Sequence, residues 1–447
     1  MKKIYKIKVQ GWVKVLPFYL FTLLPLNAQS KQWTLRQCTE YAISHNLGIQ
    51  QRDNQRRQQE LQLSTAKNSR LPDLNAQAGE SFSFGRGLTM DNTYTNRSTS
   101  STSFSIGTSI PLFTGFQIPN TIKLNQLNLE AATQDLEKAK NDIRMQVAQA
   151  YVQILYDMEI ADVAVRQVEI DSMQVARLKS FLENGKASGA EVSQQKATLA
   201  QSQLTATQAY NNLQLSLLAL TQLLELSTPD GFSVVRPDVP SSLGIPTNPD
   251  QIYAEALVFK PEVKAEQIRL DATEKSIKIA QAGLYPTLSL NGGLQTNYYK
   301  TSGMQQDGFG TQLKNNFAQY IGLNLNIPIF NRFSTRNSIR SARIDRETQQ
   351  LQLDNVKKTL YKEIQQVYYN AVAAQAKYES SEAARQSSED AFTLAQAKYE
   401  NGKANITEFN EAKNRFLKAE SDLVQARYEF LYQTTLLDFY RGKELDF

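Results

Sequence analysis

The stretch Ile110–Phe116 (IPLFTGF) returns as Ile327–Phe333 (IPIFNRF), 217 residues further along the chain. At the same offset, Glu183–Ala187 (ENGKA) is repeated without change as Glu400–Ala404. Both pairs combine a turn with the end of a regular segment, so they mark equivalent points of a larger unit. The period is far longer than that of any solenoid repeat, so these matches indicate two structural halves.

A third pair of segments supports the duplication. Leu71–Leu74 (LPDL) resembles Tyr285–Leu288 (YPTL), and it precedes the first pair by a similar distance in both halves. Prolines then crowd the middle of the chain, where no helical period is visible. We therefore expect one structural repeat at residues 29–227, a connector at 228–250 that crosses the waist of the helices, and a second repeat at 251–447.

Each repeat contains two segments in which polar and apolar residues alternate, and this alternation predicts β-strands. The Ser/Thr/Asn/Gly-rich stretches between them, 85–101 and 300–316, predict long exposed hairpin tips. We expect β-hairpins at about 72–116 and 286–333, with strands of about ten residues, a length that suits a tilted bilayer crossing. Four prolines are expected where strand meets helix: Pro72, Pro111, Pro286 and Pro328.

The apolar strand positions alternate with Ser, Thr, Asn and Gly rather than with charges, so one strand face suits lipid and the other suits water. The pattern alone also fits the edge of a soluble β-sandwich, because barrel signals are weak in each segment. In lipid, four strands cannot close a barrel, and open edges leave backbone groups unpaired. Two copies would supply eight strands and three would supply twelve, and a water-filled interior favours three.

Very long helices are expected beside the hairpins. Residues 120–184 and 331–401 contain neither Gly nor Pro, and at about 1.5 Å per residue each would approach 100 Å. The Asn-Gly pairs that follow predict turns into return helices, which gives helical hairpins at 120–227 and 334–441. Their apolar stripes are narrow and rich in alanine, a pattern typical of helices that form a wall with water on both sides. Shorter helical stretches, 34–70 and 251–284, precede the β-hairpins.

The N-terminus predicts export from the cytoplasm. Residues 1–28 hold five lysines, no acidic residue, an apolar stretch and a small residue at the end, which together indicate a cleaved signal peptide. The alternative is an N-terminal membrane anchor, but the apolar run is short for a span. Without this segment, 44 basic residues balance 44 acidic ones. The folded part therefore lacks the excess positive charge of a nucleic-acid binder.

Other classes of function are excluded by composition. One cysteine and one histidine, Cys38 and His45, cannot form a disulfide framework or a Cys/His zinc site. No nucleophile, base and orienting group stand in a recognisable context, so we expect neither an enzyme nor a cofactor. With 41% hydrophobic residues, the chain is also too polar for a protein with several membrane helices.

The duplicated architecture, the strand exits at 110–116 and 327–333, and the stretch Tyr399–Tyr428 resemble the outer-membrane efflux protein family, the TolC-like channels. The resemblance implies a mainly α protein with membrane β structure: a trimer that shares one twelve-stranded barrel above a periplasmic tunnel of helices. It also implies an adaptor protein and an inner-membrane pump as partners, and the outer membrane of a Gram-negative-type cell as location. The alternative is a periplasmic coiled-coil adaptor or scaffold, which would lack the two hairpins.

The resemblance also implies a gate at the helical tips. Aligned on the Asn-Gly-Lys-Ala turn, the acidic pair of the family falls on Glu408 and Glu411, and a closing link joins Tyr399 to Glu191. The arginine of a second link is Ala404 here. Because Glu408 and Glu411 are three residues apart, they share a helix face, and the alternative is an ordinary solvated face. The tips that would contact the adaptor, and whose lysines could replace the arginine, are Asn184, Gly185, Lys186, Asn401, Gly402 and Lys403.

Overall fold

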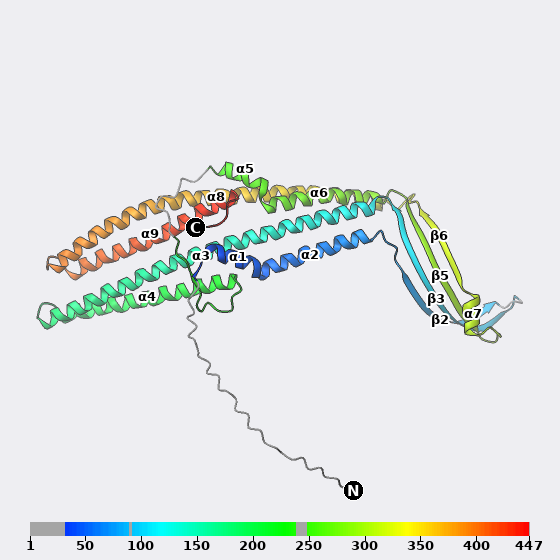
Figure 1. Ribbon diagram of the computed structural model, residues 1–447, viewed down its shortest axis with the longest axis horizontal. Helices are drawn as coiled ribbons and strands as arrows, with labels where there is room; N and C mark the ends of the chain where they lie inside the picture. Colours follow the sequence, from blue (N-terminus) through cyan, green and yellow to red (C-terminus); the bar gives the residue numbers. More distant parts are fainter. Residues whose placement is uncertain (1–31, 89–91, 238–247, 447) are drawn as a thin grey trace, which may run out of the picture.

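The computed structural model describes residues 32–88, 92–237 and 248–446 of the 447-residue chain. The expected signal peptide at 1–28 lies outside this part. In the described residues, two elongated helical layers run side by side, and a β-sheet continues from one of their ends (Figure 1). None of the described helices is long and apolar enough to cross a membrane.

The helices of the two halves match each other in length. Helices α1 (Leu35–His45) and α5 (Pro249–Phe259) each have 11 residues, and α2 (Leu47–Asn68) and α6 (Pro261–Ala282) each have 22. The long helices α3 (Gln117–Glu183) and α8 (Ser334–Glu400) each have 67 residues. Their return helices α4 (Gly189–Leu223) and α9 (Ile406–Tyr440) each have 35. This correspondence follows the duplication seen in the sequence.

The shorter helical stretches are broken once in each half, which the sequence analysis did not anticipate. Asn46 ends α1 in an extended conformation, and its side chain accepts hydrogen bonds from the backbone of Gly48 and Ile49 at the start of α2. In the second half, Lys260 is extended because Pro261 follows it and begins α6. Each break lets the chain change direction about midway along the long helices, where α1 packs on α3 and α5 on α8 (Figure 1). We call this level the waist.

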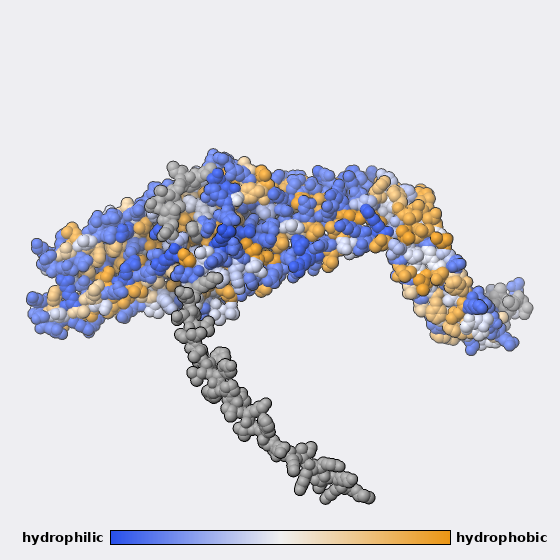
Figure 2. All heavy atoms as spheres, in the orientation of Figure 1, coloured by the Kyte–Doolittle hydropathy of each residue, from blue (hydrophilic) through white to orange (hydrophobic). Residues whose placement is uncertain are grey.

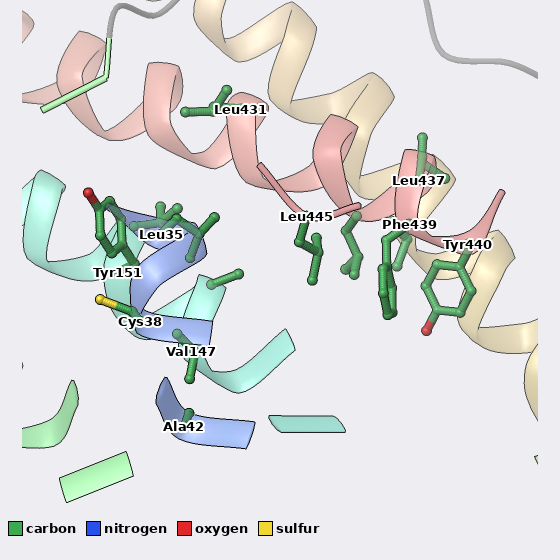
Figure 3. Packing of buried hydrophobic residues seen from close by; sticks show 14 of the residues in the cluster. Leu35, Cys38, Ala42, Val147, Tyr151, Leu431, Leu437, Phe439, Tyr440 and Leu445 are labelled. Atoms are coloured by element: carbon green, nitrogen blue, oxygen red, sulfur yellow. The ribbon is translucent and has the colours of Figure 1, made fainter. Parts of the chain in front are cut away.

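The largest hydrophobic core lies at this waist. Cys38 of α1 packs near Val147 and Tyr151 of α3, and all three are buried (Figure 3). The connector crosses here, where β4 (Ser233–Val234) pairs in parallel with β1 (Gln32–Trp33). The Tyr151 hydroxyl donates to the Val235 carbonyl at 2.6 Å, which ties the connector to α3. Burial raises the pKa of the Cys38 thiol to about 12, so this cysteine is a packed residue rather than a reactive one.

Around the waist, the helices form walls rather than a thick globule. Toward the sheet, α2, α3, α6 and α8 lie side by side in that order of contact, and toward the other end α3 packs on α4 and α8 on α9 (Figure 1). Helix α3 also packs on α9, which joins the two hairpins. Because each helix has neighbours on only some sides, much of its surface remains polar and exposed.

One antiparallel sheet with strand order β2-β3-β5-β6 contains both expected hairpins. Strands β2 (Asn75–Leu88) and β3 (Tyr94–Thr114) have 14 and 21 residues, so the expected length of about ten was too short. Residues 85–88 and 94–101, expected in an exposed tip, continue the ladder, with Gly85 opposite Arg97. Ser and Thr sit well in paired strands, and threonine favours them, so a polar composition did not indicate a loop.

The second hairpin ends differently. Strand β5 (Thr287–Thr301) has 15 residues, but β6 (Ala318–Asn326) has only 9, and the short helix α7 (Phe309–Asn315) lies between them. Beyond β6, side-chain amides replace the missing strand: the Gln312 side chain bonds both the N–H and the carbonyl of Tyr299, each at 3.0 Å. The Asn316 amide donates to Asn297 at 2.7 Å in the same way. These bonds satisfy the edge of β5 where β6 has stopped.

The four prolines occupy two kinds of place. Pro72 and Pro286 precede β2 and β5, and Pro328 follows β6, as expected for strand boundaries. Pro111 instead lies inside β3, so its expected role as a boundary was wrong. The register shifts between Pro111 and Phe113, and such an irregularity accommodates a residue that has no N–H for the ladder.

The sheet has apolar residues on an exposed face and two open edges. From Ile321 to Leu325 every second residue of β6 is apolar, and Ile321, Leu323 and Leu325 are 79%, 68% and 58% exposed. On the face seen in Figure 2, hydrophobic residues are dense over the sheet where it adjoins the helices. Strands β2 and β6 are the edges, so each has a row of backbone groups without a strand partner in the described part of the chain.

A substitution in the turn from β3 into α3 would test how closely this turn packs against the end of α6. Gly115 has φ +60°, and an added Cβ would lie 2.6 Å from the Ala282 carbonyl oxygen. We expect Gly115→Ala to lower the thermal midpoint of unfolding, measured by circular dichroism. The alanine would clash with α6, and its left-handed backbone conformation would cost about 1–2 kcal/mol more. Gly185→Ala is the control, because Gly185 has φ +70° and open space around it. Equal effects of the two substitutions would contradict the close approach of α3 and α6.

Candidate functional site

The two hairpin tips have the same backbone geometry. After α3, the Lys186 N–H bonds the Phe181 carbonyl at 2.7 Å and the Gly185 N–H bonds Leu182 at 3.0 Å. After α8, Lys403 bonds Lys398 at 2.8 Å and Gly402 bonds Tyr399 at 3.1 Å. This paired pattern is a Schellman motif, which places its glycine in the left-handed region. Gly185 and Gly402 have φ values of +70° and +71°.

The return helices begin with side-chain caps. Ser188 caps α4, and the Glu191 carboxylate accepts from the Ser188 N–H at 2.7 Å and from its hydroxyl at 3.0 Å. These hydrogen bonds lower the pKa of Glu191. Asn405 caps α9 by accepting from the Glu408 N–H at 2.9 Å. The caps fix where α4 and α9 start, and therefore where the acidic residues of their first turns lie.

Glu408 and Glu411 lie on the first two turns of α9, and both are exposed. Glu411 forms an ion pair with Arg415 at 3.3 Å, one turn further along the helix. Because the pair is exposed, it holds the Glu411 side chain only weakly. The expectation that the two glutamates share a face is consistent with their helical positions. Their meeting with the same residues of other copies stays a prediction.

The expected hydrogen bond from Tyr399 to Glu191 is not formed in the described chain, so that prediction was wrong for the single subunit. Glu191 is occupied by the Ser188 cap, whereas the Tyr399 ring stacks on Phe409 with ring centres 5.1 Å apart. Burial is the main cause that raises the pKa of Tyr399; the charge of Arg177 opposes this shift, and that of Glu191 adds to it. The two residues therefore lie near each other without a direct bond.

Arg177 of α3 supplies an arginine link between the two tips, in place of the arginine that the family has at position 404. Its guanidinium lies 5.3 Å from the centre of the Tyr399 ring and the same distance from that of Phe181. One of its nitrogens is 3.6 Å from a Glu400 carboxylate oxygen. The two hairpin tips are therefore joined by an arginine, although position 404 of the second tip is alanine.

A buried polar network joins the hairpins about three turns before the end of α3. Asp171 of α3 and Lys413 of α9 form an ion pair, and both side chains are 0% exposed. The carboxylate of Asp171 also accepts from Gln195 at 3.1 Å and from the Ser202 hydroxyl, both on α4. Asn410 of α9 donates to Gln195 at 3.2 Å. Three helices from both repeats therefore meet on one carboxylate.

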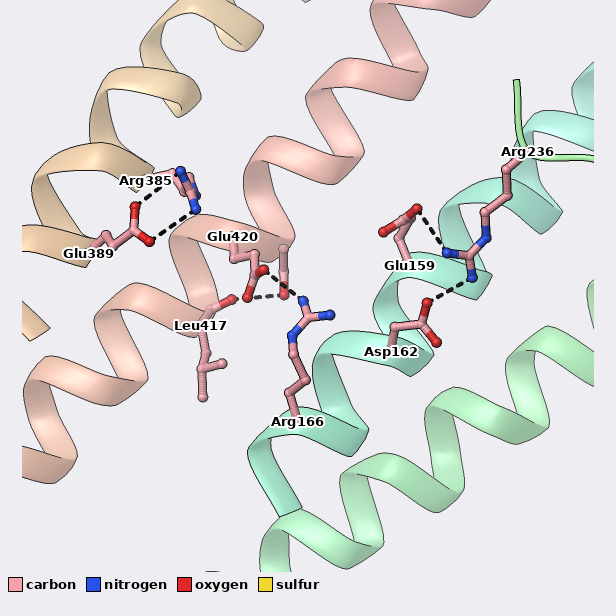
Figure 4. A network of polar contacts seen from close by, with 9 residues as sticks. Glu159, Asp162, Arg166, Arg236, Arg385, Glu389, Leu417 and Glu420 are labelled. Atoms are coloured by element: carbon pink, nitrogen blue, oxygen red, sulfur yellow. Dashed lines mark hydrogen bonds and ion pairs between the residues drawn. The ribbon is translucent and has the colours of Figure 1, made fainter. Parts of the chain in front are cut away.

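This network is not fully satisfied. In the part of the chain that the structure describes, the amide oxygens of Asn410 and Gln174 are buried without a hydrogen-bond partner. Polar groups left in this way cost free energy, so the contact between hairpins is weaker than a complete network would be. Further toward the waist, Arg166 of α3 pairs with Glu420 of α9 at 2.7 Å (Figure 4). Three successive ion pairs thus connect α3 to the second hairpin.

Sequence reasoning missed these residues because their contacts join distant parts of the chain. Asp171 and Lys413 are 242 positions apart. The duplication gave no help, since Lys196, the counterpart of Lys413 at the 217-residue offset, is exposed. A signal did exist: Lys413 lies on the same face of α9 as Phe409 and Leu417, which are buried. A lysine on a buried apolar face is rarely found without a partner of opposite charge, so its position predicts such a partner.

The described residues contain no group of three or more His, Cys, Asp or Glu side chains placed to hold a metal ion. The candidate site is therefore a set of helix tips with exposed carboxylates and connecting ion pairs.

The sequence model of the outer membrane efflux protein family matches residues 40–225 and 252–442, which lie in the first and second repeats. The chain belongs to the outer membrane efflux protein family. The expected family is thus confirmed, and with it the duplicated fold of long helical hairpins with four strands in each chain.

Several relatives show how far this efflux-family chain has diverged. Outer membrane efflux protein BepC of Brucella suis biovar 1 is 23% identical over 266 residues, or 59% of this chain and 55% of BepC. Protein CyaE of Bordetella pertussis is 26% identical over 317 residues, or 68% of this chain and 62% of CyaE. The crystal structure of the Campylobacter jejuni CmeC outer membrane channel has a TM-score of 0.75 at 17% identity, and the match covers 99% of this chain and 95% of CmeC.

The buried ion pair of this efflux-family chain gives a test of how its hairpins are held together. Lys413→Met leaves Asp171 buried without its counter-charge, so we expect a loss of about 3–5 kcal/mol in the free energy of unfolding. The loss should appear as a lower thermal midpoint of the helical signal in circular dichroism. Arg415→Met, on the same helix, removes an exposed ion pair and should change the midpoint far less. Similar effects of both variants would show that the Lys413 pair is not the stronger connection.

Proposed function

We propose that the chain is one subunit of a homotrimeric export duct in the outer membrane of a Gram-negative-type cell. The duct would conduct substrate passively from an inner-membrane pump and a periplasmic adaptor to the exterior, without catalysis. Channels of this family are trimers that work with such partners. The observation that carries the proposal is one open four-stranded sheet attached to helices far longer than a bilayer is thick.

Two features of the chain support three copies. First, in lipid the unpaired edges of β2 and β6 would cost several kcal/mol for each unsatisfied backbone group, and pairing with neighbouring copies removes this cost. Second, the helices carry large apolar side chains that the single chain leaves exposed. Leu351 and Tyr369 of α8 are 69% and 65% exposed, and Tyr210 of α4 is 62% exposed. A second copy of this chain is the occupant that would cover them.

The proposed duct uses the predicted division of the chain. Residues 1–28 act as the signal, 29–227 and 251–447 form the two repeats, and 228–250 is the connector. In the trimer, the strands would build a twelve-stranded barrel in the membrane and the helices a tunnel in the periplasm. The alternative of a periplasmic adaptor or scaffold has no support from a chain that carries an apolar sheet and matches the efflux family.

We place the gate at the tips of the tunnel. Glu408 and Glu411 of three copies would bring six carboxylates around one axis, and the ion pairs from α3 would hold the second hairpin inward. Arg177, which contacts the Tyr399 ring and Glu400, would hold the two tips together where neither the Tyr399–Glu191 bond nor an arginine at position 404 is present. The exposed tips, Asn184–Lys186 and Asn401–Lys403, would contact the adaptor. The pump, rather than the duct, would select the cargo.

The experiment that tests the function uses purified full-length protein. We expect a detergent-stable trimer by mass measurement, and ion conductance when it is reconstituted into planar bilayers. Its migration on gels should change on heating, because a closed membrane barrel resists detergent until it unfolds. A monomer that conducts by itself would overturn the shared barrel, and a stable trimer without conductance would overturn the duct.

The gate makes a separate prediction about ion selectivity. A ring of carboxylates attracts cations, so Glu408→Gln with Glu411→Gln should remove most cation preference, measured as the reversal potential in a salt gradient. The matched control is Glu379→Gln with Glu382→Gln, an exposed pair with the same spacing on α8. It lies about 30 Å from the tip, at 1.5 Å per residue. Unchanged selectivity in the Glu408 and Glu411 variant would show that these residues are only a solvated helix face.

A further inference from the structure

The start of α8 carries an unbalanced positive charge directly beside the sheet. Arg332, Arg336, Arg340 and Arg343 lie within residues 331–344, which contain no acidic residue, and all four arginines are exposed. Helical spacing of three and four residues places Arg336, Arg340 and Arg343 along one side of α8. A single helix start with this charge could be incidental, so the other helix ends at the same level matter.

The three other helix ends beside the sheet have the same bias. Lys67 lies in the last turn of α2 and Arg70 just beyond that helix, Lys123 lies in the second turn of α3, and Lys275 and Lys278 lie in the last three turns of α6. No aspartate or glutamate occurs at 61–72, 117–129 or 275–286. Together with the four α8 arginines, these residues form what we call the basic collar. The chain beyond its first 28 residues has no net charge, so the collar concentrates positive charge at one level.

The collar has no ion-pair partner in the described chain. None of its nine side chains forms an ion pair with a described carboxylate, and Lys123 bonds only the Gln126 amide oxygen, at 3.3 Å. Three carboxylates lie within three residues of the collar in sequence. Glu274, next to Lys275, pairs with Arg346 at 3.5 Å, and Asp73 accepts from the Ser109 N–H at 2.6 Å and from Asn75 at 3.0 Å. Asp345, two residues beyond Arg343, is exposed and forms no ion pair with a described residue. A neighbouring copy of the chain would bring another collar of the same sign, so assembly alone does not neutralise it.

The residues between the sheet and the collar are those of a membrane interface. Phe113 and Phe116 form one edge-to-face pair at 5.3 Å, and Phe330 and Phe333 form its counterpart at 5.5 Å. Ile329, on the apolar face that continues from β6, is 95% exposed. Girdles of aromatic residues flank the apolar band of transmembrane β-barrels. The basic residues of the collar begin directly beyond these two aromatic pairs.

Distances along the helix agree with this placement. Arg336 to Arg343 lie roughly 3–14 Å beyond the first residue of α8, at about 1.5 Å per residue. The headgroup layer is about 5–8 Å thick on each side of the bilayer. Arginine side chains extend along apolar surface and carry their charge toward the interface, so they can reach this layer from the first three turns.

We propose that the basic collar binds the phosphate groups of anionic phospholipids in the leaflet on the helical side of the membrane. Guanidinium groups suit this ligand, because their planar N–H fork can bond two phosphate oxygens at once. Bound headgroups hold the duct at a fixed depth, with the aromatic pairs in the interface and the helices in water. The inference rests on the proposed placement of the sheet in the membrane.

The test measures lipid affinity of the purified full-length protein by native mass spectrometry, with phosphatidylglycerol as the probe and phosphatidylcholine as the neutral comparison. For Arg336→Gln with Arg340→Gln and Arg343→Gln, we expect affinity for phosphatidylglycerol to fall by about fivefold for each arginine removed. The matched control is Lys357→Gln with Lys358→Gln and Lys362→Gln, which removes three charges from α8 further from the sheet. The control should bind as the unaltered protein does.

The same three arginines changed to lysine should keep much of the affinity, because lysine retains the charge. Equal affinities of the glutamine variant and the control would overturn the proposal. Weakened subunit association with unchanged lipid affinity would also overturn it, since the arginines would then belong to the contact between copies. A failure of the duct itself is a separate result, because lipid binding in detergent does not require conductance, and a conducting trimer with unchanged lipid affinity would refute the collar alone.

Discussion

Backbone hydrogen bonding in lipid is the constraint on which the rest of this molecule depends. A strand surrounded by hydrocarbon has no water to satisfy its N–H and carbonyl groups, so a sheet must close on itself. Four strands in one chain are too few to do so. The unit that can exist in a membrane is therefore an assembly of copies, and in the trimer that we propose the helices attached to each sheet would form a common tunnel.

The same constraint explains why polar side chains matter at the end of the sheet. Where β6 stops, the Gln312 and Asn316 amides take over the hydrogen bonds that a strand would have made. At the other end, Pro111 is accommodated by a shift in register. The ladder is thus ended and interrupted with most of its neighbouring backbone groups still bonded.

Far from the membrane, the molecule is organised by a few contacts between the two repeats. Helix α3 supplies one residue to each of three ion pairs: Arg166, Asp171 and Arg177. Only the middle pair is fully buried, and its surroundings leave two amide oxygens unbonded. The contact between the hairpins therefore has a defined register but unsatisfied polar groups. This suits the gate that we propose, in which the hairpins would hold a closed tip and also separate. The charges are segregated as well, with acidic residues in the first turns of the return helices and bases beside the sheet.

Much of the fold followed from local patterns in the sequence. The repeated segments at 110–116 and 327–333, the long runs without Gly or Pro, and the Asn-Gly turns predicted the duplication, the long helices and the Schellman ends. These features depend on backbone preferences and on residues close together in the chain, so a sequence reveals them directly. The resemblance to the efflux family rested on the same residues, and the match to both repeats agrees with it.

Tertiary structure decided the contacts between distant residues. Tyr399 stacks on Phe409 and faces Arg177, while Glu191 caps its own helix, because helix packing sets which side chains can meet. The pairing of Asp171 with Lys413 could not be read from spacing, since neither repeat contains both partners. Strand lengths were also settled by pairing, because Ser- and Thr-rich segments form either loops or strands according to whether a neighbour offers hydrogen bonds. Local sequence thus determined the elements, and packing determined which charged and aromatic groups act on one another.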